Sequence, residues 1–206
     1  MFFLAGLTIK NVAMKNTQFY QTRLNLNQYG LKISSELNTG IRVIIEKKNH
    51  LSDLERNAQE VLGHIYLVNQ YLLKKIEKLN TLLNDGLVNQ KWEYFESDFT
   101  LVETMLNVSV FKIKSCSDFN VPVYFSLEEL ELKLAVQLKK LITLSRTVPS
   151  AYANNYCTEM KVIPGIKLDV YQLIFFAMKH SAHHLNQIST FIKINEVFDV
   201  DRLVKN

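Results

Sequence analysis

The sequence predicts an all-α protein, folded as one four-helix bundle that spans the whole chain, residues 1–206. Four long segments repeat apolar residues every three or four positions, which is the period of an amphipathic helix. Only six glycines and three prolines are available to break these segments. A chain of 206 residues can bury one proper core, whereas two domains would be cramped. Long helices without strands between them favour a bundle.

The first predicted helix runs from about residue 17 to residue 45 and contains two glycines that weaken it. Its apolar stripe consists of Tyr20, Leu24, Leu31, Leu37, Ile41 and Ile44. Asn27 and Ser34 interrupt this stripe, so either they face a polar cavity or the stripe is drawn in the wrong place. Met14 is an alternative start of the folded chain, in which case residues 1–13 form a ragged N-terminal extension.

The second predicted helix begins with a capping box, Ser52-Asp53-Leu54-Glu55, and continues to about Asn80. In a capping box the serine and glutamate side chains satisfy free backbone N–H groups at the helix start. The apolar stripe of this helix is uninterrupted, and it consists of Leu54, Ala58, Val61, Ile65, Val68, Leu72, Ile76 and Leu79. The sequence Asn84-Asp85-Gly86 then stops the helical pattern.

Two connections lack a helical period. The segment near residues 86–125 is predicted to be irregular, because aromatic residues crowd it without a steady spacing. Short strands and broken helical turns packed over one end of the bundle both fit it. A long loop is predicted near residues 147–167, which contain two prolines and a glycine.

The third and fourth predicted helices begin at recognisable caps. A second capping box, at Ser126 to Glu129, starts the third helix, which reaches about Arg146. Its core face consists of Leu127, Leu130, Leu134, Leu138 and Leu141. The fourth helix begins near Asp169, with Gln172 as its capping partner, and ends near Asn195.

The composition excludes several classes of protein. Hydrophobic residues make up 48% and charged residues 21%, as in ordinary folded proteins. The net charge of +4 is spread along the chain, without the concentrated basic stripe of a nucleic-acid binder. The apolar run at 173–178 is too short to span a bilayer, and residues 1–7 lack the basic start of a signal peptide. Two isolated cysteines cannot form a disulfide framework. We therefore expect a cytoplasmic protein with no nucleic-acid or membrane partner.

Three of the five histidines lie close together in the fourth predicted helix. His180 and His184 are four residues apart, so they share one face of the helix. The inward row of this helix consists of Leu173, Ala177, His180, His184, Gln187 and Phe191. His183 belongs to a polar row and is predicted to face solvent. Two inward imidazoles need partners, and this spacing suits a metal ion, although core histidines satisfied by hydrogen bonds are the alternative.

His64, in the middle of the second predicted helix, can meet this pair at mid-height. The sequence therefore predicts one divalent metal ion held by His64, His180 and His184. Three ligands leave a coordination position open for water or substrate, as in reactive metal sites. Glu60, one turn before His64, is a candidate for a fourth ligand, an orienting residue or a general base, but a surface carboxylate ranks first. His50 has no such context and is expected at the surface.

Two stretches resemble the DinB/YfiT-like superfamily. They are Glu60-Val61-Leu62-Gly63-His64-Ile65 and His180-Ser181-Ala182-His183-His184-Leu185-Asn186-Gln187-Ile188. That superfamily carries a similar histidine context in its second helix and an H-x-x-x-H followed by Q-I in its last. The lead-in from Pro164 to Leu173 is also similar, and the likeness covers roughly residues 54–193. The resemblance implies the family's four-helix bundle, often a homodimer, binding zinc or nickel.

The resemblance supports the site better than any single reaction. Characterised members of the superfamily include thiol S-transferases that use low-molecular-weight thiols and a mycothiol-dependent isomerase. Others are described as metal-dependent hydrolases or as stress-induced proteins. The resemblance thus implies an enzyme that transfers a low-molecular-weight thiol to an electrophilic small-molecule substrate. A metal-dependent hydrolase and a non-catalytic metal-binding stress protein are the alternatives, and the residues do not separate them.

Overall fold

The computed structural model describes the backbone of residues 3–47, 52–84, 97–106, 125–148, 158–160 and 163–203. Side chains are described from Arg23 to Ile192, within the central parts of these segments. The predictions made for His50 and for the two cysteines lie outside the described residues, as does most of the region 86–125.

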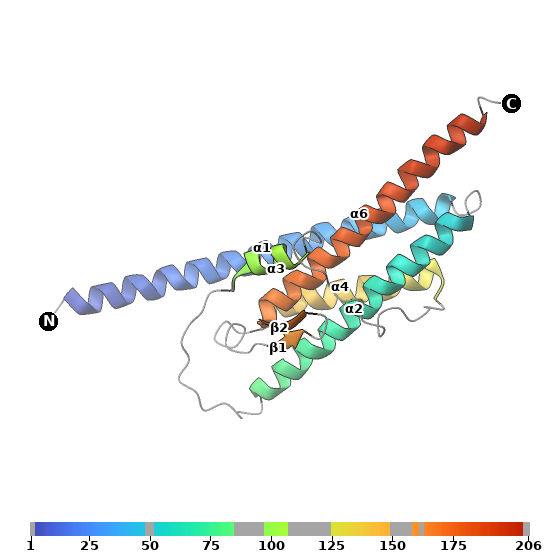
Figure 1. Cartoon of the computed structure of the whole chain (residues 1–206). Coiled ribbons are helices and arrows are strands. Elements are labelled where there is room, and N and C mark those ends of the chain that lie inside the picture. Colours follow the sequence, from blue (N-terminus) through green and yellow to red (C-terminus); the bar gives the residue numbers. More distant parts are fainter. Residues whose placement is uncertain are drawn as a thin grey trace.

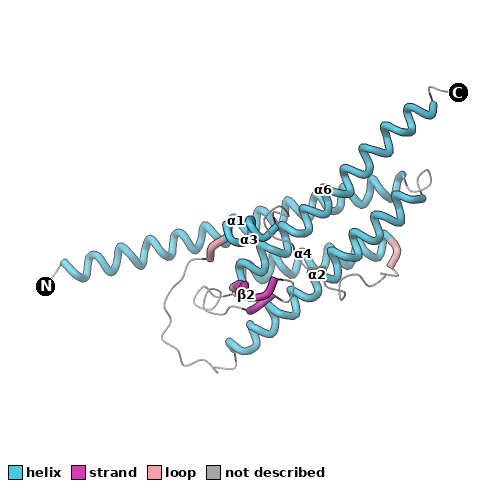
Figure 2. Tube along the Cα trace, viewed as in Figure 1, coloured by secondary structure: helices cyan, strands magenta, loops and turns pink. Residues whose placement is uncertain are grey.

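Four long helices form the predicted bundle (Figure 1). They are α1 (Phe3–Lys47), α2 (Ser52–Asn84), α4 (Leu127–Thr147) and α6 (Val170–Leu203). α1 packs mainly against α4 and α6, and α2 packs against the same two helices. The consecutive helices α1 and α2 therefore lie across the bundle from each other. Figure 2 shows that helices make up nearly all of the described chain, which confirms the all-α prediction.

The first and the last long helix of the chain, α1 and α6, are longer than the periodicity predicts. α1 begins at Phe3 and not near residue 17, so the segment interpreted as a ragged extension is helical from Phe3 onward. α6 ends at Leu203 and not near Asn195. The start of α1 and the end of α6 both project beyond the rest of the bundle (Figure 1). No helix in the described part of the chain is long and apolar enough to cross a membrane.

The buried face of α1 differs from the predicted stripe. Leu24 and Leu31 are 38% and 54% exposed. The row that faces the bundle consists of Leu26, Gly30, Ile33, Leu37, Ile41 and Ile44. Asn27 lies outside this row, where its Oδ1 accepts a hydrogen bond from Arg146 Nη2 at 2.7 Å. Of the two interpretations of the interrupted stripe, the misplaced stripe is therefore the correct one.

Gly30 explains why the pattern was misread. A Cβ atom at this position would lie 2.6 Å from Ile142 Cγ1 and 2.7 Å from Met178 Cε. The absence of a side chain thus lets α4 and α6 approach the backbone of α1 closely. A glycine carries no hydrophobic signal, so a count of apolar residues does not register it as a core position.

The predicted caps of α4 and α6 and the core stripes of α2 and α4 are confirmed, whereas the side chain of Ser52, in the capping box predicted for α2, lies outside the described residues. Ser126 and Glu129 form the capping box of α4, and its five predicted core leucines are all buried. At the start of α6, Gln172 N donates to Asp169 Oδ1 at 2.8 Å, and Asp169 N donates to Gln172 Oε1 at 2.9 Å. In α2 the stripe residues from Ala58 to Leu79 are buried, apart from the half-buried Val61.

The connections contain more regular structure than predicted. Within the region 86–125, α3 (Phe99–Leu106) is a short helix that packs against α6. The predicted long loop at 147–167 was wrong in its second half, where β1 (Thr158–Met160) pairs antiparallel with β2 (Ile163–Leu168).

A lysine of α2 fixes this hairpin to the bundle. Lys75 Nζ donates hydrogen bonds to Thr158 Oγ1 and Glu159 O, each at 3.1 Å. Gly165 adopts a φ of 83°, which glycine tolerates, and its N–H donates to Glu159 Oε1 at 2.9 Å. A strand of only three residues shows too little alternation for a sequence pattern to reveal it.

Candidate metal centre

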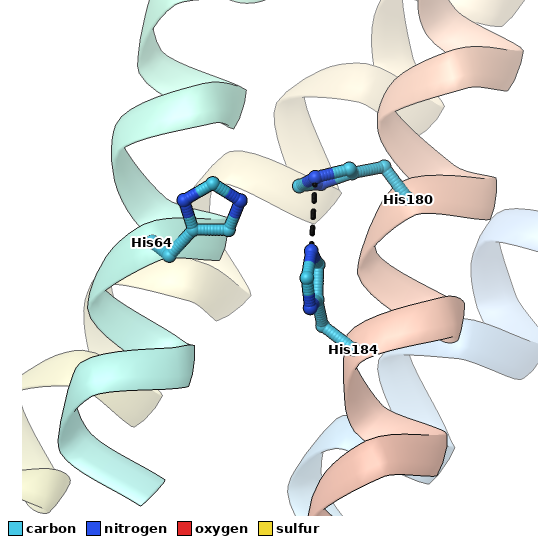
Figure 3. Close-up of side chains that lie close together, drawn as sticks. All are labelled: His64, His180 and His184. Atoms are coloured by element: carbon cyan, nitrogen blue, oxygen red, sulfur yellow. Dashed lines mark hydrogen bonds between the residues drawn. The ribbon is translucent and has the colours of Figure 1, made fainter. Parts of the chain in front are cut away.

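The three predicted ligands lie together between two helices (Figure 3). His64 projects from α2, and His180 and His184 project from α6 toward it. Each ring offers one nitrogen, and these atoms all lie within 4.8 Å of one another. The predicted convergence of the three imidazoles is confirmed.

The helical phase of α6 brings its two histidines inward. His180 is 8% exposed, and His184 is half-buried one turn later. The predicted inward row is wrong beyond this point, because Gln187 is exposed and Phe191 is 41% exposed. There the buried residues are Leu185, Ile188 and Ile192. The change follows from the neighbours of α6, because Leu185, Ile188 and Ile192 line a hollow together with Gly40 and Val43 of α1.

His183 faces solvent, as predicted from its polar row. Its ring lies 5.3 Å from that of His184 between centroids, and it is not part of the three-histidine group. The structure thus separates two adjacent histidines into one that lines the site and one that lies at the surface.

The spacing of the rings suits a shared ion. His180 Nε2 and His184 Nε2 are 3.1 Å apart. In a tetrahedral zinc site with bonds of about 2.0–2.1 Å, neighbouring ligand atoms lie about 3.3 Å apart. The His64 ring centroid lies 5.2 Å from that of His180 and 4.8 Å from that of His184. Three converging imidazoles are a donor set that zinc and nickel both accept.

A comparison with known protein families identifies the family of this chain. The family model of the DinB superfamily matches residues 20–188, a range that contains all three histidines. The chain belongs to the DinB superfamily. No curated protein and no solved structure matches the chain. The family and the histidine cluster therefore carry the functional argument.

In this DinB-superfamily chain, burial keeps the two α6 imidazoles neutral. Burial lowers the pKa of His180 well below its usual value of 6.5, and the neighbouring His184 and His64 add to the effect. Burial likewise lowers the pKa of His184 to about 4, and the hydrogen bond that Gln187 Oε1 accepts from His184 Nδ1 opposes this shift. A neutral imidazole has a free lone pair, which metal binding requires.

Two further residues contact the histidines of the site. The sequence pattern did not assign either of them to it. The ring of Phe176 stacks on that of His180, with centroids 5.8 Å apart and planes 15° from parallel. Gln187 Oε1 lies 2.8 Å from His184 Nδ1. The spacing offered a signal for Gln187, because a residue three positions after a helical histidine lies on the same side of the helix.

Glu60 is engaged elsewhere. Its Oε1 accepts a hydrogen bond from Arg56 Nε at 3.3 Å, and both side chains are largely exposed. Glu60 is not part of the group whose ligand atoms converge. The geometry favours the surface carboxylate, the interpretation that ranked first from the sequence.

Proposed function

We propose that the chain is a metal-dependent enzyme that transfers a low-molecular-weight thiol to an electrophilic small-molecule substrate. The observation that supports this proposal is the group of three histidines drawn from two helices. Structural zinc sites use four protein ligands, whereas this group offers three among the described residues. A three-ligand site leaves room for an exogenous ligand beside the protein nitrogens.

The reaction balances without any redox partner. A divalent ion held here would stabilise the thiolate form of a bound thiol by its positive charge. A bond forms between sulfur and an electrophilic carbon, and the bond from that carbon to the leaving group breaks. The leaving group departs with the electron pair, and the thiol proton passes to solvent.

The chain's own residues prepare the site for this chemistry. His180 and His184 are kept neutral by burial, so both offer a lone pair at physiological pH. Phe176 packs flat on the His180 ring and limits its rotation. Among the described residues His180 is enclosed, whereas His64 and His184 are half-buried and keep part of their surface exposed, which is the side that the proposal assigns to the exogenous ligand. A small thiol and its acceptor can approach from that side.

Metal analysis of the purified protein, followed by a thiol-transfer assay, tests the proposal. We expect about one zinc or nickel ion per chain. The assay follows the loss of free thiol with glutathione, cysteine, coenzyme A and mycothiol, each with 1-chloro-2,4-dinitrobenzene as a model electrophile. The His64→Ala variant is the matched control, because it removes one ligand and leaves the α6 pair in place.

The outcomes separate the candidate functions. Metal-dependent consumption of one thiol, lost in His64→Ala, supports thiol transfer. Ester or amide hydrolysis that needs the metal but no thiol would replace it with the hydrolase alternative. A metal-loaded protein without activity in either assay favours the non-catalytic alternative. Absence of bound metal after loading would overturn the metal site itself.

A further inference from the structure

The Gln187 side chain lies between two histidines and contacts both. Its Oε1 is 2.8 Å from His184 Nδ1, and its Nε2 is 3.2 Å from His183 Nε2. All three residues lie on α6, within two turns of the helix. Gln187 therefore connects a ring that lines the metal centre with a ring that faces solvent.

The chemistry of the amide fixes the position of each proton. A carbonyl oxygen only accepts hydrogen bonds, so His184 Nδ1 must carry the proton. The Nε2 atom of His184 then keeps its lone pair, and this is the atom that faces His180 Nε2. At its other end the amide nitrogen only donates, so His183 Nε2 accepts.

We propose that Gln187 is a positioning residue of the metal centre, which holds His184 in the tautomer whose Nε2 can bind an ion. His183 in turn sets the orientation of the Gln187 amide. This inference rests on the metal site of the proposed function. It assigns a role to His183, which contacts no ligand atom of the cluster directly.

His183 is needed because an amide has two ends of nearly equal shape. If the amide turned by 180°, its NH₂ group would face His184 Nδ1 and would demand a lone pair there. The ring proton would then move to Nε2, where it would block metal binding. Gln187 is exposed, so packing does not fix its orientation. Its donation to His183 Nε2 holds the amide in this orientation when His183 carries its own ring proton on Nδ1, because a proton on His183 Nε2 would instead favour the turned amide.

The test uses two measurements on four variants. Nitrogen-15 NMR of the metal-free protein reports which His184 nitrogen carries the proton. Competition with a chromophoric chelator reports the Kd for zinc. Gln187→Met keeps the length of the side chain but removes both hydrogen bonds. Gln187→Glu keeps an acceptor for His184, and His183→Ala removes only the partner of the amide. Asn186→Ala truncates the adjacent exposed amide and serves as the control.

We expect the wild type and Asn186→Ala to show the proton on His184 Nδ1. Gln187→Met should show a mixture of tautomers and a zinc affinity about tenfold weaker, the lower end of the range for residues that orient a ligand. Gln187→Glu should retain both the tautomer and the affinity. His183→Ala should fall between the wild type and Gln187→Met in both measurements.

The proposal is overturned if Gln187→Met keeps the wild-type tautomer and affinity. It is also overturned if Gln187→Glu loses as much affinity as Gln187→Met, because the acceptor would then be irrelevant. A wild-type protein that binds zinc but transfers no thiol would refute the proposed function and not this inference. The NMR measurement on metal-free protein would still decide whether Gln187 fixes the His184 ring.

Discussion

The α1–α4 and α2–α6 interfaces are built from different kinds of residue. Every buried side chain that α1 contributes within its described residues is apolar, and Gly30 brings its backbone against Ile142 of α4. On the α4 side Ser145 is buried, and its hydroxyl donates to Ile142 O within the same helix. The α2–α6 interface buries three polar residues, Asn69, His180 and Ser181. One side of the bundle thus contains the close approach at Gly30, and the other contains the candidate site.

The polar interface is ordered by its own hydrogen bonds. Asn69 Nδ2 donates to Ser181 Oγ at 3.2 Å, and Ser181 Oγ donates to Ala177 O at 2.8 Å. Among the described residues, Asn69 Oδ1 and His180 Nδ1 are buried without a hydrogen-bond partner. Such groups cost stability, so this interface gives up stability for a defined alignment of α2 and α6. The comparison teaches that stability and metal binding should respond to different substitutions.

The largest effect should come from the ligands. His180→Ala and His184→Ala should each weaken zinc binding by more than about 100-fold, beyond the range for residues that only orient a ligand. His183→Ala should leave the metal content nearly unchanged at saturating zinc. Metal content measured after dialysis checks this. Equal loss in all three variants would contradict the helical phase of α6.

Metal loading should also raise the melting temperature of the wild type, because the ion binds only the folded chain. Chelation should reverse this shift, and His64→Ala should show little response to either treatment. Thermal unfolding with and without chelator measures the effect. An identical melting curve in both conditions, after loading has been verified, would leave the histidines as core residues.

Ile142→Ala should destabilise the apolar interface strongly while leaving the metal centre intact. Removing most of a buried isoleucine typically costs about 2–5 kcal/mol. Urea unfolding of metal-free protein measures the loss, and chelator competition should give a zinc affinity close to that of the wild type. A parallel loss of affinity would show that the two interfaces are coupled.

Gly30→Ala and Gly40→Ala should act in opposite directions. Alanine favours a helix over glycine by about 1 kcal/mol, so Gly40→Ala should stabilise, since a Cβ there meets nothing within 4 Å. At Gly30 the new methyl group would collide with Ile142. Overpacking of this kind costs about 1–3 kcal/mol of stability, which should outweigh the gain in helix propensity. Urea unfolding compares them, and Ile142→Ala should relieve the penalty at Gly30. Equal stabilisation by both alanines would refute the close contact.

A further effect concerns acid. The unfolded chain takes up protons on histidines near pH 6.5, whereas the folded pKa of His184 is about 4. The unfolded state therefore binds more protons between these values, and the metal-free protein should lose stability as the pH falls from about 6.5 to about 4. Urea unfolding at several pH values measures this loss, which should be smaller in His184→Leu.

Asp169 acts in the opposite direction in the same range. Burial raises the pKa of its carboxyl group to about 6, so protonation favours the folded state as the pH falls through this value. The contribution of His184 is therefore read from the difference between wild type and His184→Leu at each pH, in which Asp169 cancels. An unchanged difference across the range would contradict the lowered pKa of His184.

The features that could be predicted from the sequence are those that depend on regular helical spacing and local hydrogen bonds. The α2 stripe, the Ser126 cap and the inward pair on α6 all depend on helical spacing and local hydrogen bonds, and all three appear in the structure. On α1, Leu37, Ile41 and Ile44 were predicted correctly. The first half of the buried row was missed because Gly30 contributes through the absence of a side chain. Apart from the convergence of His64 with the α6 pair, contacts between distant segments were also out of reach.

Only part of the site could be predicted, because helical spacing determines some of its residues and not others. His180 and His184 follow from their spacing, and His64 from its place on the α2 stripe. The contact between Gln187 and His184 depends on rotamers that no periodicity specifies. The hairpin at β1 and β2 is held by Lys75, more than eighty residues earlier in the chain. A local pattern cannot reveal such a partner.

The position of α2 and α6 in the chain has a consequence for synthesis. His64 lies in the second long helix, whereas His180 and His184 lie in the last one. A ribosome therefore exposes the first ligand long before the other two exist, and a nascent chain that lacks α6 has no pair to complete the site. Because domains fold as their segments emerge, metal capture would wait until α6 has been made. A bound ion would then distinguish a chain that contains α6 from one that stops before it.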